Sequence, residues 1–170
     1  MEGFKEISAF ELQKTPFEMV GKDWMLISAV HGGRVNMMTA SWGGFGVMWN
    51  KNVAFAVIRP QRFTKTLVDG EDKFTLSFYG GEYRKMLNYC GSASGKDEDK
   101  VKGANLTPVF SDGTVSFAEA EVTLVCKKLF AQGFDGNSFI DKSIIGKMYP
   151  GGDFHTLYIA EIEKVYVKNA

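Results

Sequence analysis

The sequence predicts a single-domain, mainly β protein, in which antiparallel strands form a barrel and short helices lie at its periphery. Segments rich in β-branched and aromatic residues, bounded by Gly, Asn, Asp or Pro, recur along the chain. The helical candidates between them are too short to pair regularly with strands in βαβ units. Two strand candidates approach a dozen residues, a length that suits bent barrel strands. The 170 residues fit one domain, residues 1–170.

Strand-like segments recur from the first third of the chain to its end. The clear candidates and one weaker candidate are approximately Met25 to Val30, Ser41 to Met48, Val53 to Ile58, Phe74 to Phe78, Ala120 to Phe130, His155 to Val167 and, more weakly, Val115 to Ala118. In the last long strand, the alternation of apolar and charged residues breaks near Ala160 to Ile162. This break predicts a β-bulge.

Short helices are expected between the strands. The candidates are Ala9 to Thr15, Phe63 to Val68, Tyr83 to Tyr89, Asp97 to Gly103 and Ser138 to Ile144. Thr64 is predicted as an N-cap, and Ser94 with Asp97 resembles a capping box.

The composition is that of a globular protein with a sizeable core, because 45% of the residues are hydrophobic, 14% aromatic and 24% charged. Twenty Lys and Arg residues balance twenty Asp and Glu residues, so no net field favours nucleic acid or an anionic membrane as a partner. Charged residues interrupt residues 1–17, unlike a signal peptide. The longest aliphatic and aromatic run, Val53 to Ile58, is too short for a membrane span. A soluble, cytoplasmic protein is the expectation.

The two cysteines, Cys90 and Cys126, have no CxxC spacing and no nearby histidine pair. The sequence therefore predicts neither a metal site nor a redox dithiol. Buried or half-buried free thiols are expected; a disulfide is the alternative, which a cytosolic location disfavours.

A segment of small and hydroxylated residues, Asn36 to Gly44, contains Trp42 and ends in paired glycines. Small residues let a flat ring approach the backbone, whose N–H and C=O groups can pair with the edge of the ring. The alternative is a strand that enters a turn with a core tryptophan, and composition alone favours that alternative.

A second segment, Ile58 to Thr64, follows a hydrophobic strand and leads into a predicted helix. The free N–H groups of a helix start, beside Arg59 and Arg62, form a natural seat for a phosphate. The alternative is that both arginines are solvated surface charges and that Thr64 only caps the helix.

A third segment, Cys90 to Lys100, begins as a loop of small residues and continues as a run of charged residues. Ser92, Ser94, Gly95 and Lys96 could donate hydrogen bonds to an anion, although the P-loop pattern is absent because Asp97 follows Lys96. A solvated, capped helix is the alternative.

The fourth segment, Asp153 to Tyr158, places His155 at the start of the last long strand. There it could donate a hydrogen bond to a ligand, although a lone histidine is more often structural. His31 precedes Gly32 and Gly33 in a predicted hairpin turn and is assigned no role.

No hydrolase pattern such as GxSxG or HExxH occurs, and no catalytic side chain is predicted. The chemistry would then belong to a bound cofactor, for which the protein supplies position and polarity.

Taken in order, the four segments resemble the flavin reductase-like family of FMN-binding split β-barrels, particularly its flavoredoxin-like members. The resemblance rests on Asn36 to Trp42, Arg59 to Thr64, Cys90 to Lys100 and Asp153 to Tyr158, and it spans most of the chain. It implies a Greek-key, antiparallel split barrel that binds FMN. One departure is Ala160, where many relatives have Gly.

The resemblance implies that the first segment lines the isoalloxazine ring, the second and third hold the phosphate, and the fourth approaches the flavin. The implied cofactor-binding residues are Asn36, Met38, Thr39, Ala40, Ser41, Trp42, Arg59, Gln61, Arg62, Thr64, Ser92, Ser94, Gly95, Lys96 and His155. The charged and hydroxyl groups among the phosphate residues would form charge-assisted hydrogen bonds. Trp42 would shield one face of the ring.

The resemblance also implies a homodimer with the cofactor near the subunit junction and two FMN per dimer. The expected function is redox: a donor, either NAD(P)H or another small molecule or protein, reduces FMN, which passes electrons to an acceptor. Two alternatives stay open. One is an FMN-binding electron-carrier module that does not oxidise NAD(P)H, and the other is a structural or interaction domain that has lost the pocket.

Overall fold

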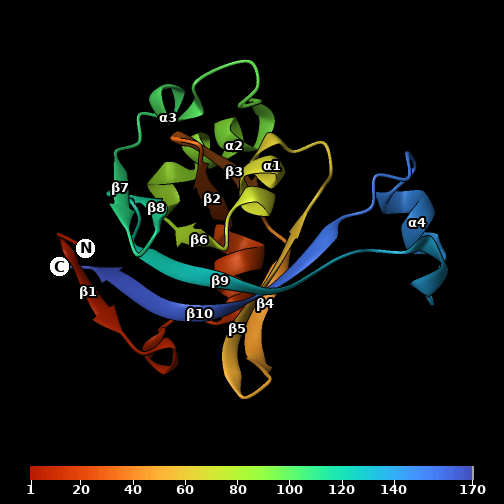
Figure 1. Cartoon of the computed structure of the whole chain (residues 1–170), viewed down its shortest axis with the longest axis horizontal. Helices are drawn as coiled ribbons and strands as arrows, with labels where there is room; N and C mark the ends of the chain where they lie inside the picture. The colour runs from red at the N-terminus through yellow and green to blue at the C-terminus, as the bar shows by residue number, and fades with distance from the viewer. Residues whose placement is uncertain (170) are drawn as a thin grey trace.

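The computed structural model describes residues 1–169 and consists of a curved antiparallel sheet with helices around it (Figure 1). The main sheet has the strand order β3-β2-β6-β9-β10-β5-β4, and β1 pairs with β10. Its strands are β1 (Phe4–Ile7), β2 (Met25–His31), β3 (Arg34–Ala40), β4 (Gly43–Met48), β5 (Lys51–Ile58), β6 (Lys73–Phe78), β9 (Val122–Gly133) and β10 (Thr156–Lys168). A separate hairpin comprises β7 (Pro108–Ser111) and β8 (Thr114–Phe117). The predicted mainly β, antiparallel fold class is confirmed.

The long strands β9 and β10 form the centre of the sheet, with β6 beside β9 and β5 beside β10. The register between β9 and β10 shifts at Ile159/Ala160 and again at Ile162/Lys164, which confirms the predicted bulge. Such bulges bend a strand and increase its twist. Ala160 is fully buried at the first shift, so its methyl group is accommodated in the core.

Two apolar clusters fill the body of the protein. The larger lies inside the barrel and includes Phe74 and Tyr158, whose ring centroids are 6.5 Å apart in an edge-on contact. The smaller cluster comprises Leu26, Met37, Tyr79, Leu87, Cys90, Leu106, Phe117 and Ala120. Because alternate residues of β2 enter different clusters, this strand is buried on both faces. The free thiols of Cys90 and Cys126 are both buried, as predicted.

Short helices cover the sheet. They are η1 (Ala9–Glu11), the π-helix η2 (Phe17–Asp23), α1 (Phe63–Gly70), η3 (Gly81–Tyr83), α2 (Arg84–Ser92), α3 (Lys100–Gly103), η4 (Gly136–Ser138) and α4 (Ser143–Met148). Among residues 1–169, no helix combines the length and the apolar character that crossing a membrane would need.

Three of the predicted helices differ from the structure. The segment from Ala9 to Thr15 forms only the three-residue η1, because Leu12 is already extended and Pro16 disfavours helix at the residue before it. The segment from Asp97 to Gly103 becomes helical only at Lys100. The segment from Ser138 to Ile144 is divided between η4 and α4.

The predicted N-caps are wrong. Arg62 is the N-cap of α1, and no side chain caps this helix, so Thr64 lies inside its first turn. Asp99, rather than Ser94, caps α3, and its carboxylate accepts from the N–H groups of Val101 and Lys102. A carboxylate at a helix start is a stronger acceptor than a serine hydroxyl.

Three strands were not predicted: β1, β3 and β7. The predicted strand from Ser41 to Met48 begins at Gly43, where a Cβ would lie 2.2 Å from the carbonyl oxygen of Phe55. Only glycine therefore allows β4 to approach β5 so closely.

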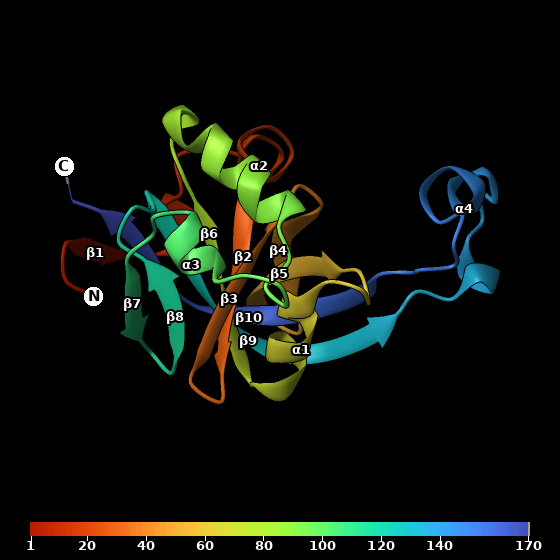
Figure 2. The ribbon, with the colours of Figure 1, turned by 90° about the horizontal axis from the view of Figure 1, so that it is seen from above.

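Residues 134–155 form an arm between β9 and β10 that stands away from the barrel (Figures 1 and 2). The arm contains η4 and α4 and has a small aromatic core of its own. The ring of Phe154 lies 4.9 Å from that of Tyr149 and 5.7 Å from that of Phe139, measured between centroids. The base of the arm contacts the barrel through Asp153, which forms an ion pair with Arg59.

Candidate functional site

Two adjoining hollows lie where β3, the start of α1, the end of α2 and the base of the arm meet. The larger, of about 340 Å³, is here named the cationic pocket; it is lined by Asn36, Met38, Arg59, Gln61, Arg62, Phe63, Thr64, Ser92, Ala93, Ser94, Gly95 and Lys100. The smaller, of about 230 Å³, is named the edge pocket; it is lined by Met38, Thr39, Ala40, Ser41, Trp42, Val57, Arg59, Arg62 and His155. Met38, Arg59 and Arg62 line both, so the two pockets form one continuous site.

The structure brings the four predicted segments together. All of the predicted cofactor-binding residues except Lys96 line one of the two pockets. Lys96 is exposed and lines a neighbouring hollow. That these residues bind a cofactor stays a prediction, but the geometry supplies a single site for them.

Three cations meet at the cationic pocket. Arg62 is half-buried and donates to the carbonyl oxygen of Gly91 at 2.5 Å. Burial lowers the pKa of Arg62, and the charge of Arg59 lowers it further. Burial likewise lowers the pKa of Lys100, and Arg62 adds to that effect. These groups repel one another, so the pocket favours an anion.

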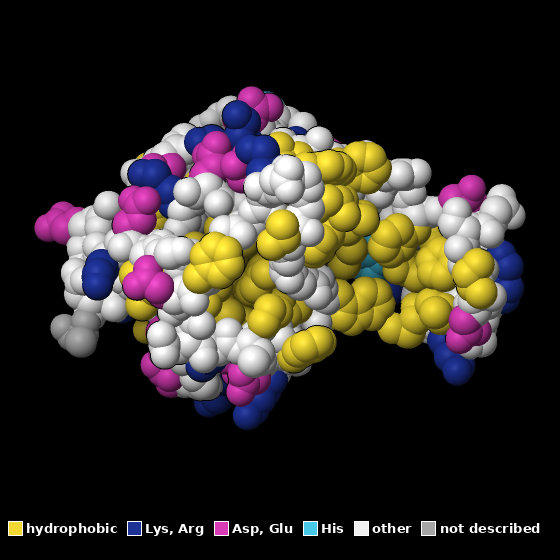
Figure 3. Space-filling view, turned by 90° about the horizontal axis from the view of Figure 1, so that it is seen from below, with side chains coloured by type: hydrophobic (Ala, Val, Ile, Leu, Met, Phe, Trp, Pro, Cys, Tyr) yellow, Lys and Arg dark blue, Asp and Glu magenta, His cyan; other side chains and the backbone are white. Residues whose placement is uncertain are grey.

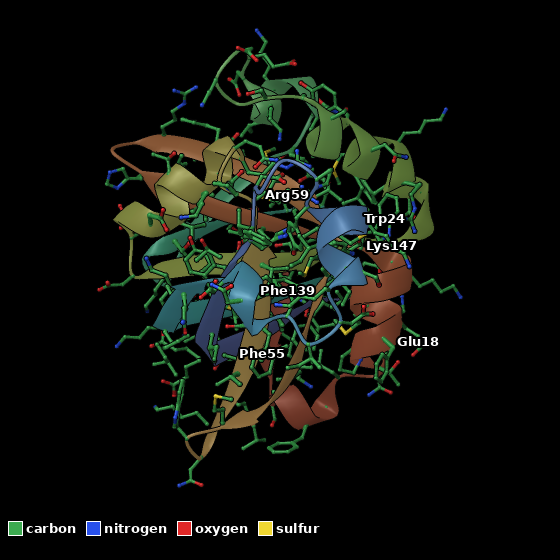
Figure 4. All side chains as sticks on the ribbon, turned by 90° about the vertical axis from the view of Figure 1, so that its right-hand side faces the viewer. Glu18, Trp24, Phe55, Arg59, Phe139 and Lys147 are labelled. Carbon is green, nitrogen blue, oxygen red and sulfur yellow. The ribbon has the colours of Figure 1, made fainter. Side chains whose placement is uncertain are left out.

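Only Arg59 has a carboxylate partner at this pocket among residues 1–169. It forms an ion pair with Asp153 of the arm and donates to the carbonyl oxygen of Met148 at 2.8 Å. Gln61 also donates to Asp153, at 2.8 Å. Figure 4 looks onto the arm and shows Arg59 beside it. The arm therefore fixes the position of Arg59.

The first turn of α1 opens onto the cationic pocket, because Phe63 and Thr64 line it and no side chain caps the helix. The N–H groups of an uncapped first turn are ready donors for an anion. The buried Thr64 hydroxyl accepts from Asn36 at 3.0 Å, which leaves its own proton for a ligand.

Lys100 is the site residue that the sequence interpretation missed. It is 3% exposed, and its ammonium group donates to the carbonyl oxygens of Met37 at 2.7 Å and Cys90 at 2.6 Å. These bonds join β3 to the end of α2. The signal in the sequence is Asp99, since the cap that starts α3 there places Lys100 at the first helical position.

The loop between α2 and α3 is held against β3. A Cβ on Gly95 would lie 2.3 Å from the amide oxygen of Asn36, so a side chain here would have to displace the Asn36 amide from its bond to Thr64. Arg34 donates to the carbonyl oxygen of Gly95. The loop that supplies Ser94 is therefore positioned before any ligand arrives.

The edge pocket lies along β3, which is an edge strand of the main sheet. An edge strand has backbone N–H and C=O groups on one side without a strand partner. The Thr39 hydroxyl turns away to donate to the carbonyl oxygen of Leu87 at 2.5 Å. This arrangement leaves main chain beside the pocket, as the small residues of this segment predicted.

Trp42 and His155 close the edge pocket, with ring centroids 5.1 Å apart. Nδ1 of His155 lies 2.8 Å from the Tyr149 hydroxyl. Burial, and then the charge of Arg59, lower the pKa of His155 to about 4. The ring is therefore neutral near pH 7, with one N–H to donate.

A family model described as the flavin reductase like domain matches residues 20–170, most of the chain. The chain belongs to the flavin reductase-like family. No match was found among the curated proteins.

Solved structures of flavin reductase-like proteins share the fold. An FMN-binding domain of a flavin reductases-like enzyme from Shewanella baltica is 15% identical with a TM-score of 0.71, covering 97% of this chain and 77% of the other. Flavoredoxin of Desulfovibrio vulgaris is 20% identical with a TM-score of 0.69, covering 96% and 77%. A putative flavin reductase with a split barrel domain from Shewanella frigidimarina is 20% identical with a TM-score of 0.69, covering 87% and 68%. The split-barrel prediction is confirmed.

The site of this flavin reductase-like chain fits FMN, the cofactor named for the Shewanella baltica domain. FMN carries a dianionic phosphate and a planar tricyclic ring. Arg62 and Lys100 lack a carboxylate partner in the described residues, so the cationic pocket fits the phosphate. The main chain of β3 beside the edge pocket fits a flat ring that has donors and acceptors along its edge.

Proposed function

We propose that the protein binds FMN in the joined pockets and works as a flavin reductase or flavoredoxin-like electron-transfer protein, with NAD(P)H or a protein as donor. The observation that carries the proposal is the charge of the cationic pocket. Arg59, Arg62 and Lys100 face it with Asp153 as the only carboxylate paired with any of them among residues 1–169. A permanent cluster of this kind is costly without an anion and favours one strongly.

Different residues of the chain would bind the phosphate and the ring of FMN. Arg62, the Thr64 hydroxyl and the free N–H groups of α1 would donate to the phosphate. The main chain of Met38 to Ser41 would pair with the ring edge, and Trp42 would shield one face from water. Bound FMN would supply the hydride and electron transfer.

FMN binding is tested by titrating the apoprotein and recording the visible spectrum, followed by anaerobic addition of NADH or NADPH. We expect a yellow complex whose flavin absorbance bleaches. Binding without bleaching by either nucleotide would remove the reductase function and leave an electron carrier reduced by a protein. A protein that stays colourless with added FMN would overturn both functions.

We further propose that the protein is a homodimer, with the apolar face between barrel and arm as the interface. Figure 3 shows apolar side chains running across this face from the barrel to the arm. Exposed apolar side chains occur on β4 and next to it (Trp42, Val47, Trp49), towards the end of β9 that leads into the arm (Leu129, Phe130) and on the arm itself (Ile140, Ile144, Met148). Ile140 is 98% exposed in one chain. An apolar face of this kind around a site typically marks a protein interface.

The dimer is tested with the double substitution Ile140→Asp and Ile144→Asp. We expect light scattering to give twice the chain mass of 18.9 kDa for the wild type and the single mass for the variant. Phe110→Asp is the matched control, because Phe110 is 64% exposed on β7. A wild-type protein that is monomeric while loaded with flavin would contradict the proposal.

A further inference from the structure

The arm ends in a buried pair of titratable groups next to the edge pocket. Tyr149 follows α4, and His155 directly precedes β10. Both side chains are buried, and their rings meet edge-on with centroids 5.5 Å apart. The Tyr149 oxygen lies 2.8 Å from Nδ1 of His155.

The hydrogen-bonding needs of Tyr149 determine which of these two atoms is the donor. A buried tyrosine hydroxyl has one proton and needs an acceptor for it. Within residues 1–169, Nδ1 of His155 is the only hydrogen-bond partner of this hydroxyl. If Nδ1 carried a proton, the hydroxyl would have to accept it, and the hydroxyl proton would be left without an acceptor. Tyr149 is therefore the donor, and Nδ1 is unprotonated.

The proton of the neutral imidazole is then on Nε2. In the described residues Nε2 has no hydrogen-bond partner. It is also not fully enclosed, unlike the buried unpaired oxygens of Ser28, Tyr79 and Thr114. His155 lines the edge pocket beside Trp42. Nε2–H is thus open to whatever enters that pocket.

We propose that Tyr149 fixes His155 as the Nε2–H tautomer, so that the arm presents one neutral hydrogen-bond donor to an acceptor atom of the ligand in the edge pocket. The ligand step rests on the proposed function. Tyr149 acts through His155 and is a positioning residue. The acceptor is an oxygen or nitrogen of the flavin ring or of a second substrate beside it.

Burial is the main reason that this donor stays neutral, and the two arginines beside it add to the effect. Arg59 and Arg62 disfavour the imidazolium, while Asp153 favours it and is itself paired with Arg59. Burial and the two arginines outweigh Asp153 and lower the pKa of His155 to about 4. Across neutral pH the group donates a hydrogen bond and does not serve as a proton source.

The tautomer can be measured directly by NMR of the apoprotein with ¹⁵N-labelled histidine. The chain has two histidines, and His155→Gln identifies the signals of His155. We expect a protonated Nε2 and an unprotonated Nδ1 from pH 8 down to about pH 5. A protonated Nδ1 in that range, or an imidazolium at pH 6, would overturn the proposal.

Tyr149→Phe removes the donor and keeps the ring. We expect Nδ1–H to become populated and the midpoint of the His155 titration to rise by about 0.5 to 1 in pH, as the loss of one neutral hydrogen bond predicts. Tyr83→Phe is the matched control, since Tyr83 packs against Tyr79 and not against the arm. Unchanged His155 signals in Tyr149→Phe would contradict the role of Tyr149.

The source of the acceptor is tested by adding FMN and then NAD⁺ as a non-reducing probe, with FMN binding measured separately by flavin fluorescence. A shift of the Nε2 signal on adding FMN identifies the flavin, and a shift only with NAD⁺ identifies a second substrate. If FMN binds and neither addition moves Nε2, the ligand step is wrong. If FMN does not bind, the proposed function fails with that step, and the apoprotein spectrum still decides the tautomer.

Discussion

Replacing Arg62 by methionine should raise the dissociation constant for FMN by about 10- to 100-fold, because a charge-assisted hydrogen bond to the phosphate contributes roughly 1.5–3 kcal/mol. Arg62 lines both pockets and, within the described residues, donates only to the carbonyl oxygen of Gly91. Its charge is therefore not neutralised inside the protein. The affinity is measured by quenching of flavin fluorescence as FMN is titrated into the apoprotein.

The same substitution should affect the apoprotein far less than it affects binding. Burial and Arg59 both lower the pKa of Arg62, so the charged side chain is under electrostatic strain before the ligand arrives. Its removal relieves that strain and offsets the loss of the bond to Gly91. Functional sites often reduce stability in this way. Chemical denaturation of the apoprotein measures this effect.

Lys96→Met is the matched control for Arg62→Met. Lys96 is a cation of the loop between α2 and α3, but it is exposed and lines neither pocket. Surface substitutions of this kind change free energies by about 0.5 kcal/mol or less, which is roughly a twofold change in affinity. Equal losses of affinity in the two variants would contradict the assignment of Arg62.

The parts of the fold that the sequence predicted are those in which residue pattern and burial agree. β2, β6 and β10 carry β-branched or aromatic runs bounded by turn residues, and each is found close to its predicted bounds. The break at Ala160 to Ile162 predicted the bulge, because a register shift interrupts the alternation that a regular strand needs.

β3 was missed because its residues do not alternate. Asn36, Met37 and Met38 are all buried, since the strand is covered on one face by the barrel core and on the other by helices. A strand buried on both faces has no polar face, so its sequence lacks the alternation of apolar and polar residues that indicates a strand. For the segment from Asn36 to Gly44 a ligand contact was one interpretation and a strand entering a turn was the alternative, and the structure makes Asn36 to Ala40 both a strand and a pocket wall.

The phosphate-side lysine could not be chosen from the sequence. Lys96 and Lys100 both lie in one charged run, and only the helix start decides which of them turns inward. The predicted cap was at Ser94 and the predicted anion donor was Lys96, whereas the helix starts at the Asp99 cap and buries Lys100. Contacts between distant parts of the sequence could not be predicted either. Arg59 and Asp153 are far apart in sequence and meet only because the arm folds back to the end of β5.

Replacing Lys100 by methionine should destabilise the protein by about 2–4 kcal/mol, which is the second large effect that we expect. The variant leaves the carbonyl oxygens of Met37 and Cys90 buried without their donor, and each unsatisfied group costs roughly 1–3 kcal/mol. The variant no longer buries a charge, and this offsets part of the destabilisation. The loss remains because both carbonyls stay enclosed between β3 and α2. The midpoint of unfolding in urea measures it.

Lys102→Met separates this effect from any general change in α3, because Lys102 lies in the same helix and is exposed. We expect its midpoint to stay within about 0.5 kcal/mol of the wild type. Lys100→Met should also weaken FMN binding, since β3 forms a wall of both pockets and the end of α2 supplies Ser92 and leads into the loop of Ser94. If Lys100→Met unfolds at the wild-type midpoint, the two carbonyls have found other donors. The buried ammonium group would then be part of the anion site alone.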